Sequence, residues 1–546
     1  ELFGGRSLIA KILTEEMDPK CDALGPDNKL IICAGILGDT AAPCSGRLSV
    51  GGKSPLTGTI KEANAGGTFA KYLVSLGLKS VIVENQPSDN QWNIVVLGED
   101  SVEFLPADPY MGMNNYELVD RLRQDFGDKI SIASIGCAGE RGYRNSTLQI
   151  TDPDGRPSRA AARGGLGAVM GSKQIKAFII KDRGAYKGEL VNKAEFTEKN
   201  RFYTKEILAN PVSGGGLPNL GTAVLVNATN AAGILTTRNF SRGTFEHAES
   251  LSGEHIAELQ AERNGVMKHA CHRGCVIQCS QVYNDADGNY LTSGFEYETI
   301  GLVGSNCEIK DIDVVARIDH MCDDLGIDTM DAGCTIGVAM EAGKIAFGDG
   351  EAAIALVQEM IDGTELGRIL GDGTETAGRY FNVARIPTVK GQAMAAYDPR
   401  GLKGTGVTYA TSPMGADHTA GNVLGMPGDP ADKEGKVELS RNAQIAMAVM
   451  DSLGMCIFAS FVFESPDNIQ ALADMVGAKY GGKWDINRLM GLGFEAIALE
   501  RKFNKLAGFT DKDDCLPEFM TKEALPESGH VFDITPSELA ETLPFD

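Results

Sequence analysis

The chain lacks any apolar run of the roughly 18 residues that a membrane-spanning helix needs, so we expect no membrane span. It also lacks an excess of basic residues, since 51 Lys and Arg oppose 74 Asp and Glu for a formal net charge of −23. Nucleic acids and anionic membranes attract basic surfaces, so this deficit argues against both as partners. Low-complexity segments are absent too, and the composition is that of a globular protein.

Cysteine is present, but without the repeated spacing of a disulfide framework. Twelve cysteines in 546 residues therefore indicate a reducing compartment, and we expect the cytoplasm. The 66 glycines predict tight turns and places where the backbone approaches a ligand closely. Because the chain begins abruptly at Glu1 rather than Met, we expect further residues before it, so any signal peptide is invisible.

The hydrophobic pattern changes along the chain. Short β-rich runs such as "KLIICAGIL" and "AFIIKD" alternate with Gly-rich turns over residues 1–190, which predicts an α/β sheet domain. From about Ala194 onward helical periodicity dominates. The loop-like stretch "YDPRGLKGTGVTYATSPMG" suggests a boundary near residue 395. We therefore expect an α/β N-terminal sheet domain followed by two mainly α-helical domains, at 191–395 and 396–546.

The segment "HACHRGCVIQC" (269–279) places Cys271, Cys275 and Cys279 at every fourth position. In a helix that rises about 1.5 Å per residue, the first and last would lie roughly 12 Å apart, too far for one metal centre. A shared site needs a loop, and Gly274, which tolerates positive φ, is the expected turn. An iron–sulfur cluster, zinc, and a buried helix without metal all stay open. Zinc fits less well because no second matched pair of cysteines follows.

Two similar hexapeptides occur in the helical part, "DDLGID" at 323–328 and "DSLGMC" at 451–456. Each follows an amphipathic helix and predicts a helix end with Gly in the left-handed cap conformation. Two helices that merely end alike are the plain alternative. Because the agreement extends beyond the cap, we interpret the turns as a cradle for two copies of one polar ligand around a pseudo-twofold axis. Cys456 is then the candidate for a fourth thiolate.

The sequence resembles the tungsten-containing aldehyde ferredoxin oxidoreductases along essentially its whole length. The motifs are "TAAPCSGRLSVGGKSPLTGTIKEANAGG", "RAAARGGLGAVMGSKQIKA", "GGGLPNLGTAVLVN", "FEYETIGLVGSN", "DDLGIDT", "AYDPRGLKGTGVTYATS" and "DSLGMC". The resemblance implies the fold of that family, a tungsten (or molybdenum) bis-pterin with Mg²⁺ bridging the pterin phosphates, and a [4Fe-4S] cluster.

The resemblance also implies which residues form the site. The cluster ligands would be Cys271, Cys275, Cys279 and Cys456. The two turns, with Asp323, Asp328, Asp451 and Cys456, would hold the pterins, and the further pterin-contacting positions would be Arg47, Asn64, Gly66, Arg159 and Ala160. Guanidinium groups and free backbone N–H groups suit phosphates, and glycine admits close approach. The other cysteines are expected to be structural: Cys21, Cys33, Cys44, Cys137, Cys307, Cys322, Cys334 and Cys515.

Glu298 in "FEYET" and His418 in "SPMGADHTAGN" match the catalytic pair of the family. A buried carboxylate and a histidine beside a metal can move protons during carbonyl oxidation. Glu296 is two residues away and is easily confused with Glu298. Taken alone, either glutamate is more typical of a surface charge, and an isolated histidine is more often structural.

The chain departs from the archaeal pattern of the family at two places, and the first of them, with the acidic composition, resembles a bacterial-type large subunit. Three residues rather than two separate Cys271 from Cys275. In "RIDH", Arg317 occupies the glutamate position of a Glu-x-x-His iron site before His320, so we expect that subunit-bridging iron to be absent. The chain resembles a branch whose large subunit works with separate iron–sulfur, and sometimes flavin, subunits, and we expect an oligomer.

The resemblance predicts oxidation of a small aldehyde to a carboxylate, with electrons leaving through the cluster to ferredoxin or a dedicated iron–sulfur subunit. A rival keeps the cofactor and reduces an aromatic ring, as in benzoyl-CoA reductases, with Cys307 near the metal. A third hypothesis is a zinc-stabilised scaffold without catalysis. The sequence determines neither the aldehyde nor the choice between tungsten and molybdenum.

Overall fold

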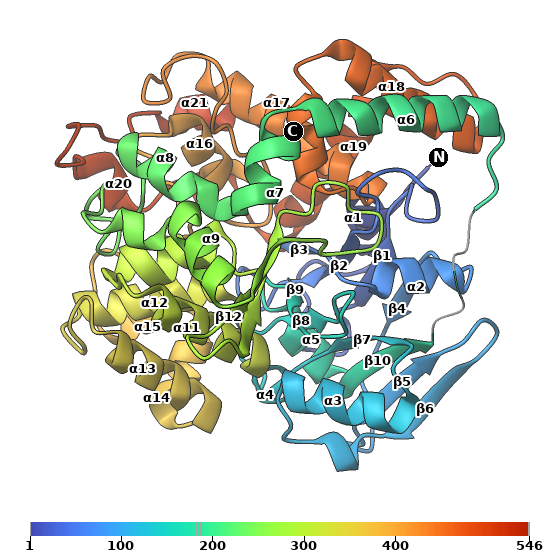
Figure 1. Cartoon of the computed structure of the whole chain (residues 1–546), viewed down its shortest axis with the longest axis horizontal. Helices are drawn as coiled ribbons and strands as arrows, with labels where there is room; N and C mark the ends of the chain where they lie inside the picture. The colour runs from blue at the N-terminus through green and yellow to red at the C-terminus, as the bar shows by residue number, and fades with distance from the viewer. Residues whose placement is uncertain (1, 182–183, 185–187, 544–546) are drawn as a thin grey trace.

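The computed structural model describes residues 2–181, 184 and 188–543, and its strands are concentrated at the N-terminal end (Figure 1). A four-stranded sheet has the order β3-β2-β1-β4, and a six-stranded sheet has the order β6-β5-β10-β7-β8-β9. The strands are β1 (Leu30–Ala34), β2 (Leu48–Lys53), β3 (Ile60–Ala65), β4 (Ser80–Val83), β5 (Asn93–Leu97), β6 (Val102–Pro106), β7 (Ile130–Ser134), β8 (Leu148–Ile150), β9 (Arg159–Ala161) and β10 (Ile175–Lys181). The helices of this part are α1 (Gly5–Glu16), α2 (Phe69–Ser75), α3 (Asn115–Phe126), α4 (Cys137–Glu140) and α5 (Leu166–Ser172).

The two sheets contain the same antiparallel meander. Strands β1, β2 and β3 pair in sequence in one sheet, and β7, β8 and β9 do so in the other. The last strands of the two meanders, β3 and β9, lie against each other. Apolar side chains from both sheets, with those of α2 and α5, form one core between them. This arrangement places two equivalent strand edges at one locus.

Beyond β10 the chain is mainly helical, so the predicted fold class is confirmed. The α-helices are α6 (Lys193–Ala209), α7 (Leu217–Leu220), α8 (Leu225–Ala231), α9 (Gly253–Glu262), α10 (Tyr297–Thr299), α11 (Ile312–Leu325), α12 (Thr329–Glu341), α13 (Gly350–Asp362), α14 (Glu365–Gly371), α15 (Thr374–Tyr380), α16 (Lys403–Thr411), α17 (Lys436–Leu453), α18 (Pro466–Tyr480), α19 (Ile486–Ala507), α20 (Glu518–Lys522) and α21 (Pro536–Ala540). Small sheets are formed by β11 (Val266–His269), β12 (Ser280–Asn284) and β13 (Tyr290–Ser293), and by β14 (Thr388–Val389) with β15 (Gln392–Ala393). The domain limits at 190/191 and 395/396 stay predictions.

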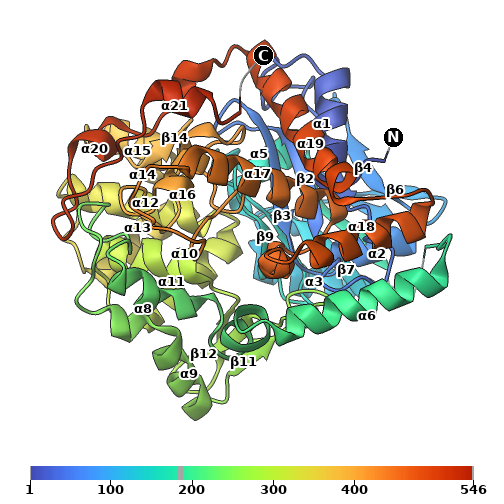
Figure 2. The same ribbon diagram turned by 90° about the horizontal axis from the view of Figure 1, so that it is seen from above.

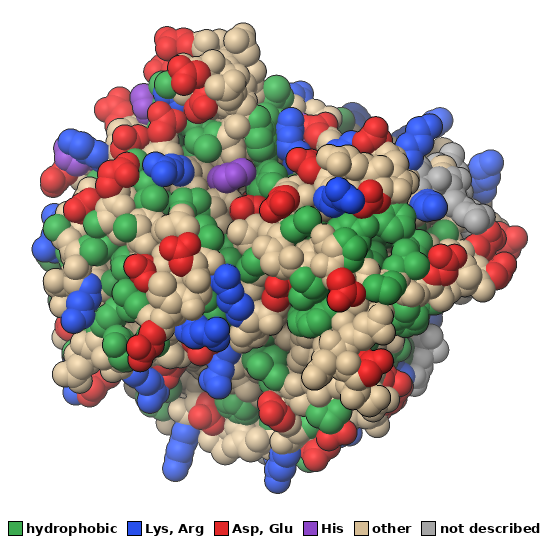
Figure 3. All heavy atoms as spheres, turned by 90° about the horizontal axis from the view of Figure 1, so that it is seen from below, with side chains coloured by type: hydrophobic (Ala, Val, Ile, Leu, Met, Phe, Trp, Pro, Cys, Tyr) green, Lys and Arg blue, Asp and Glu red, His purple; other side chains and the backbone are tan. Residues whose placement is uncertain are grey.

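Packing between distant helices closes the molecule around the sheets. Helix α6 runs alongside α18 at one edge, as Figure 2 shows from above. Helices α17 and α19 pack on each other and on α1. On the face drawn in Figure 3, acidic and basic side chains are interspersed. None of the described helices has both the length and the apolar character to cross a membrane.

Candidate active site and metal centre

A cavity of about 300 Å³ lies where β3 and β9 face the ends of α11 and α17. Thirteen of the residues predicted for the site line it, from both sheets and from distant helical segments: Arg47, Asn64, Gly66, Arg159, Ala160, Cys271, Cys279, Glu298, Asp323, Asp328, His418, Asp451 and Cys456. The remaining one, Cys275, lies directly behind Cys271. The structure therefore brings all of the predicted site residues to one locus.

The two Leu-Gly motifs end their helices in the same way. Helix α11 ends at Leu325 with Gly326 at φ 83°, and α17 ends at Leu453 with Gly454 at φ 73°. Both glycines therefore adopt the left-handed cap conformation that the sequence predicts. The acceptor carbonyls of the caps also match, since Gly454 O accepts from Arg47 N at 3.1 Å and Gly326 O accepts from Thr147 N at 2.9 Å.

Each cap rests on a glycine at the end of an equivalent strand. A Cβ on Gly35, after β1, would lie 2.1 Å from Gly454 N, and a Cβ on Gly136, after β7, would lie 2.2 Å from Leu325 O. Such contacts are too short for any side chain, so glycine is required at both positions. The two meanders and the two helix ends thus form a pair of similar cradles that face one cavity, the arrangement expected for two copies of one ligand.

The cysteine segment is a loop, so its interpretation as one face of a buried helix is wrong. After β11 the chain turns at Gly274 with φ 87°, as predicted. The Sγ atoms of Cys271 and Cys275 and a ring nitrogen of His272 all lie within 4.8 Å of one another. Cys279 and Cys456 are buried beside them, and burial raises the pKa of Cys456 to about 11 although Arg47 lowers it.

Two further residues of this locus were missed by sequence reasoning. Cys44, expected to be an isolated structural cysteine, lies against the loop: its N–H donates to Gly274 O and its carbonyl accepts from Cys456 N, both at 2.9 Å. His272 is fully buried, and burial lowers its pKa to about 3, so the ring is neutral. The spacing of three residues between Cys271 and Cys275 was the only available signal for His272, and nothing local marks Cys44.

Arginines from both meanders reach the cavity. Arg47 donates from Nε to Asn64 Oδ1 and from a terminal nitrogen to Asn64 O at 3.2 Å. Arg159 donates to Ser280 Oγ at 2.5 Å. A Cβ on Gly66 would lie 3.3 Å from both the Arg47 guanidinium and the Cys271 sulfur, so glycine keeps this wall open.

The donor set fits a phosphate-bearing metal cofactor and a cluster. Five basic side chains line the cavity although the whole chain is strongly acidic: Arg6, Arg47, Lys61, Arg159 and Arg163. Among the buried side-chain nitrogens that have no hydrogen-bond partner in the described part of the chain, three lie at this locus: Arg159 Nε, His418 Nδ1 and His272 Nε2. Buried polar atoms are nearly always paired, so these mark places where a polar ligand belongs.

Glu298 and His418 form a close pair at the cavity. His418 Nε2 lies 3.0 Å from Glu298 Oε1, and Glu298 is only 8% exposed, so its interpretation as a surface charge is wrong. Glu296 is engaged elsewhere, accepting from Thr222 Oγ1 at 2.6 Å and lying 3.9 Å from Arg159. The geometry therefore separates the two neighbouring glutamates by their partners.

Cys307, Arg317 and His320, which the sequence analysis also singled out, have other partners in the structure. Cys307 is fully buried, its thiol 3.4 Å from the carbonyl oxygens of Leu302 and Gly333, and it is absent from the residues that line the described cavity. Arg317 is exposed and lies 4.0 Å from Glu351, while His320 stacks on Tyr116 with ring centroids 4.4 Å apart.

Grouped thiols, buried cations and an acid–base pair around one cavity define an oxidoreductase with metal cofactors. The family model for the aldehyde ferredoxin oxidoreductase N-terminal domain matches residues 1–182, and that for domains 2 and 3 matches residues 198–544. The chain belongs to the aldehyde ferredoxin oxidoreductase family, which confirms the resemblance seen in the sequence.

Individual relatives agree. The tungsten-containing aldehyde ferredoxin oxidoreductases of Pyrococcus horikoshii and Thermococcus kodakarensis are each 35% identical over 97% of this chain and 89% of theirs. A more distant relative is the WOR-like subunit of an aliphatic sulfonate oxidoreductase of Pyrococcus furiosus, at 25% identity over 78% of this chain and 72% of that protein. The BamBC active-site complex of benzoyl coenzyme A reductase shares the fold, with a TM-score of 0.78, 18% identity, and coverage of 99% of this chain and 88% of that one.

Proposed function

We propose that the protein oxidises aldehydes to carboxylates at a tungsten or molybdenum bis-pterin, and that the two electrons leave through a [4Fe-4S] cluster. The balanced reaction converts one aldehyde and one water into a carboxylate, three protons and two electrons. One observation carries the proposal: the 3.0 Å Glu298–His418 pair lies in the cavity that the thiols and the two helix ends also line. The names of the 35% identical relatives support the same chemistry.

The residues of the two cradles would hold the cofactors. Cys271, Cys275, Cys279 and Cys456 would ligate the cluster. The pterins, with Mg²⁺ between their phosphates, would lie against the turns at Asp323, Asp328 and Asp451 and against Arg47, Asn64, Gly66, Arg159 and Ala160. When bound, the metal supplies a Lewis acid and a two-electron acceptor.

The protein's own part in the reaction is to orient the substrate and move protons. From the cavity wall His418 would hydrogen-bond the aldehyde oxygen, and Glu298 would accept the proton of the attacking water. Because His418 Nε2 lies 3.0 Å from Glu298 Oε1, a proton taken up by one side chain can pass to the other. Both side chains are largely shielded from solvent, which limits competition from bulk water.

Glu298→Gln tests the assignment. We expect the turnover of small aldehydes to fall by roughly 10²–10⁴-fold because the proton acceptor is lost. The rate at which an electron-accepting dye is reduced measures this turnover. Glu296→Gln, the matched control two residues away, should lose far less. Normal turnover in Glu298→Gln would contradict the role. Aromatic CoA thioesters assayed in parallel test the ring-reducing alternative, which faster turnover of those substrates would favour.

Elemental analysis of untagged protein tests the cofactors and the electron acceptor together. At least about four Fe with one W or Mo per chain supports the cofactor assignment, whereas Zn without Fe would contradict it. Arg273 and Gly274 are exposed, so the loop reaches the surface next to Cys271 and Cys275. We propose that an iron–sulfur protein, a dedicated subunit with or without a flavin subunit, receives electrons here. Iron well above four per chain supports that subunit, and a fully active homo-oligomer with free ferredoxin contradicts it.

A further inference from the structure

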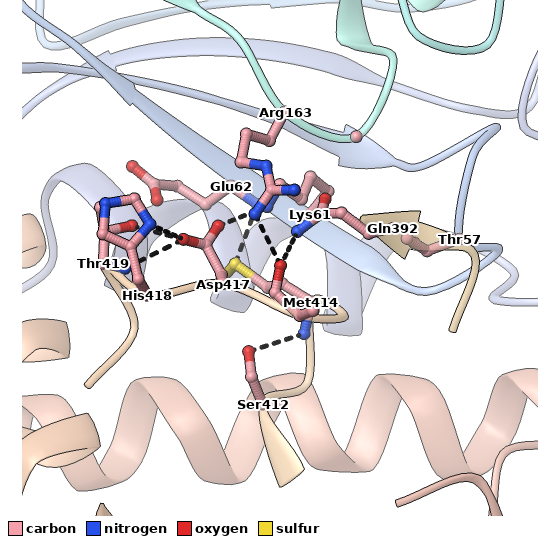
Figure 4. A network of polar contacts seen from close by, with 12 residues as sticks. Thr57, Lys61, Glu62, Arg163, Gln392, Ser412, Met414, Asp417, His418 and Thr419 are labelled. Atoms are coloured by element: carbon pink, nitrogen blue, oxygen red, sulfur yellow. Dashed lines mark hydrogen bonds and ion pairs between the residues drawn. The ribbon is translucent and has the colours of Figure 1, made fainter. Parts of the chain in front are cut away.

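The loop that carries His418, residues 412–419, is held by basic side chains from the N-terminal sheet region (Figure 4). Lys61 on β3 donates from Nζ to Asp417 Oδ2 at 3.1 Å. Arg163, which follows β9, donates to the carbonyl of Ala416 at 2.7 Å. These two contacts attach the loop to the sheet region through the two residues that precede His418.

Lys61 is an unusual partner for this purpose because its side chain is completely buried. Its stem passes Gly164, where a Cβ would lie 2.6 Å from Lys61 Cγ, so a glycine makes room for it. Burial lowers the pKa of Lys61, although Asp417 opposes the shift. A buried ion pair is weak evidence for stability, since desolvation offsets its attraction. We therefore interpret the Lys61–Asp417 ion pair as a device that positions the loop 412–419 rather than one that stabilises the fold.

Asp417 lies between the lysine and the histidine. Its Oδ1 accepts from Thr419 N at 3.0 Å and from Thr419 Oγ1 at 2.8 Å, while Oδ2 accepts from Lys61. Burial alone would raise the pKa of Asp417, but Lys61, Arg163 and His418 together lower it well below its usual range. The carboxylate is thus ionised and fixed in orientation.

Basic and acidic side chains therefore alternate along a row of four residues: Lys61, Asp417, His418 and Glu298. His418 Nδ1 lies 3.8 Å from Asp417 Oδ1, and Nε2 lies 3.0 Å from Glu298 Oε1. Glu62 lies beside Lys61, and Arg163 faces Asp417 and is faced in turn by Asp328 and Asp331. At the other end of the row, Glu296, Tyr397 and Tyr409 face Glu298.

We propose that Lys61 is a positioning residue for His418: through Asp417 it holds the loop 412–419 against β3 so that the imidazole stays on Glu298. This inference rests on the proposed roles of His418 and Glu298. Lys61 itself does not need to touch the substrate. Its charge also sets the local field, because removing one buried cation leaves the remaining groups of the row better able to retain a proton.

Lys61→Met tests this, with Lys61→Arg as the conservative control. In Lys61→Met we expect Fe and W or Mo contents equal to wild type and kcat at least roughly tenfold lower, with a smaller change in KM. The pH profile of kcat/KM should move up by roughly one unit, because a nearby positive charge is lost. In Lys61→Arg, which keeps the positive charge, kcat and the pH profile should stay close to those of wild type. Asp417→Asn, which removes a negative charge, should move the profile in the opposite direction.

An unchanged pH profile and kcat in Lys61→Met, or equal loss in Lys61→Arg, would overturn the proposal. A crystal structure of Lys61→Met gives a readout independent of the substrate: we expect the His418 ring to leave Glu298, and an unmoved ring would also overturn it. If wild type oxidises no aldehyde, the proposed function fails while this structural test still stands. Should Lys61→Met not fold, the profile of Asp417→Asn decides.

Discussion

The two helix ends that face the cavity use the same backbone device for different tasks. Two residues after the cap glycine, the first turn carries Asp328 and the second carries Cys456. Asp328 pairs with Arg163 at 3.2 Å, and Arg163 holds the loop of His418. Cys456 lies among the thiols of the cysteine loop. In the proposed enzyme, one cradle is therefore joined to the acid–base pair and the other to the cluster.

The aspartates that precede the cap glycines also differ in their partners. Asp323 accepts a neutral hydrogen bond from Gln149 at 3.2 Å, while Asp451 lies 3.4 Å from Arg6. Arg6 is itself bound by two 2.8 Å hydrogen bonds to Glu500 on α19. Similar turns thus keep the same backbone geometry while their side-chain partners diverge. In the proposed enzyme, the first turn lies on the side of the acid–base pair and the second on the side of the cluster.

Cys456→Ala should have the largest effect, because it removes a proposed ligand of the cluster through which the electrons leave. We expect iron to fall well below about four per chain and the cluster signal in electron paramagnetic resonance to weaken or change, because one of the four proposed thiolate ligands is lost. Cys322→Ala, at a buried cysteine of α11 on the other side, is the control and should keep its iron. Full iron content in Cys456→Ala would remove this cysteine from the ligand set.

Asp328→Asn should impair the acid–base pair, through Arg163 and the loop of His418, and leave the cluster intact. Asparagine can still cap α12, whose Met330 N–H bonds to Asp328 Oδ1, but the charge opposite Arg163 is lost. We expect kcat/KM to fall roughly tenfold, and the cluster signal to stay at wild-type strength. A change in the cluster signal with normal turnover would reverse the assignment of the two sides.

Alanine at the cap glycines should give the smallest effect and compare the cradles directly. In both variants a left-handed alanine costs about 1–2 kcal/mol. A Cβ at Gly454 would also lie 2.7 Å from the Gly35 backbone, whereas at Gly326 the nearest atoms are the Asn115 amide at 3.0 Å and the Gly136 backbone nitrogen at 3.1 Å. Thermal unfolding should therefore show a lower Tm for Gly454→Ala than for Gly326→Ala. Equal values would mean that the two cradles are equally tolerant.

Local features of the fold could be predicted because they depend on short stretches of chain. The helix ends at Leu325 and Leu453 follow from glycine's freedom at positive φ, and the turn at Gly274 follows from the limited span of one metal site. The change from alternating to helical periodicity predicted the fold class. For the site residues, the long motifs of the family resemblance were needed, since single glutamates and histidines are ambiguous by themselves.

The sequence by itself determined the fold class, the two cap turns and, through its motifs, the family, whereas it predicted a loop around the cysteines only if they share one site. Only the tertiary structure decided which side chains meet: Lys61 with Asp417 across 356 residues, Cys44 beside Gly274, and Glu298 rather than Glu296 beside His418. The physical reason is that backbone conformation is set by neighbouring residues, whereas a buried charge or thiol acquires its role from partners that only the packed sheets and helices bring together.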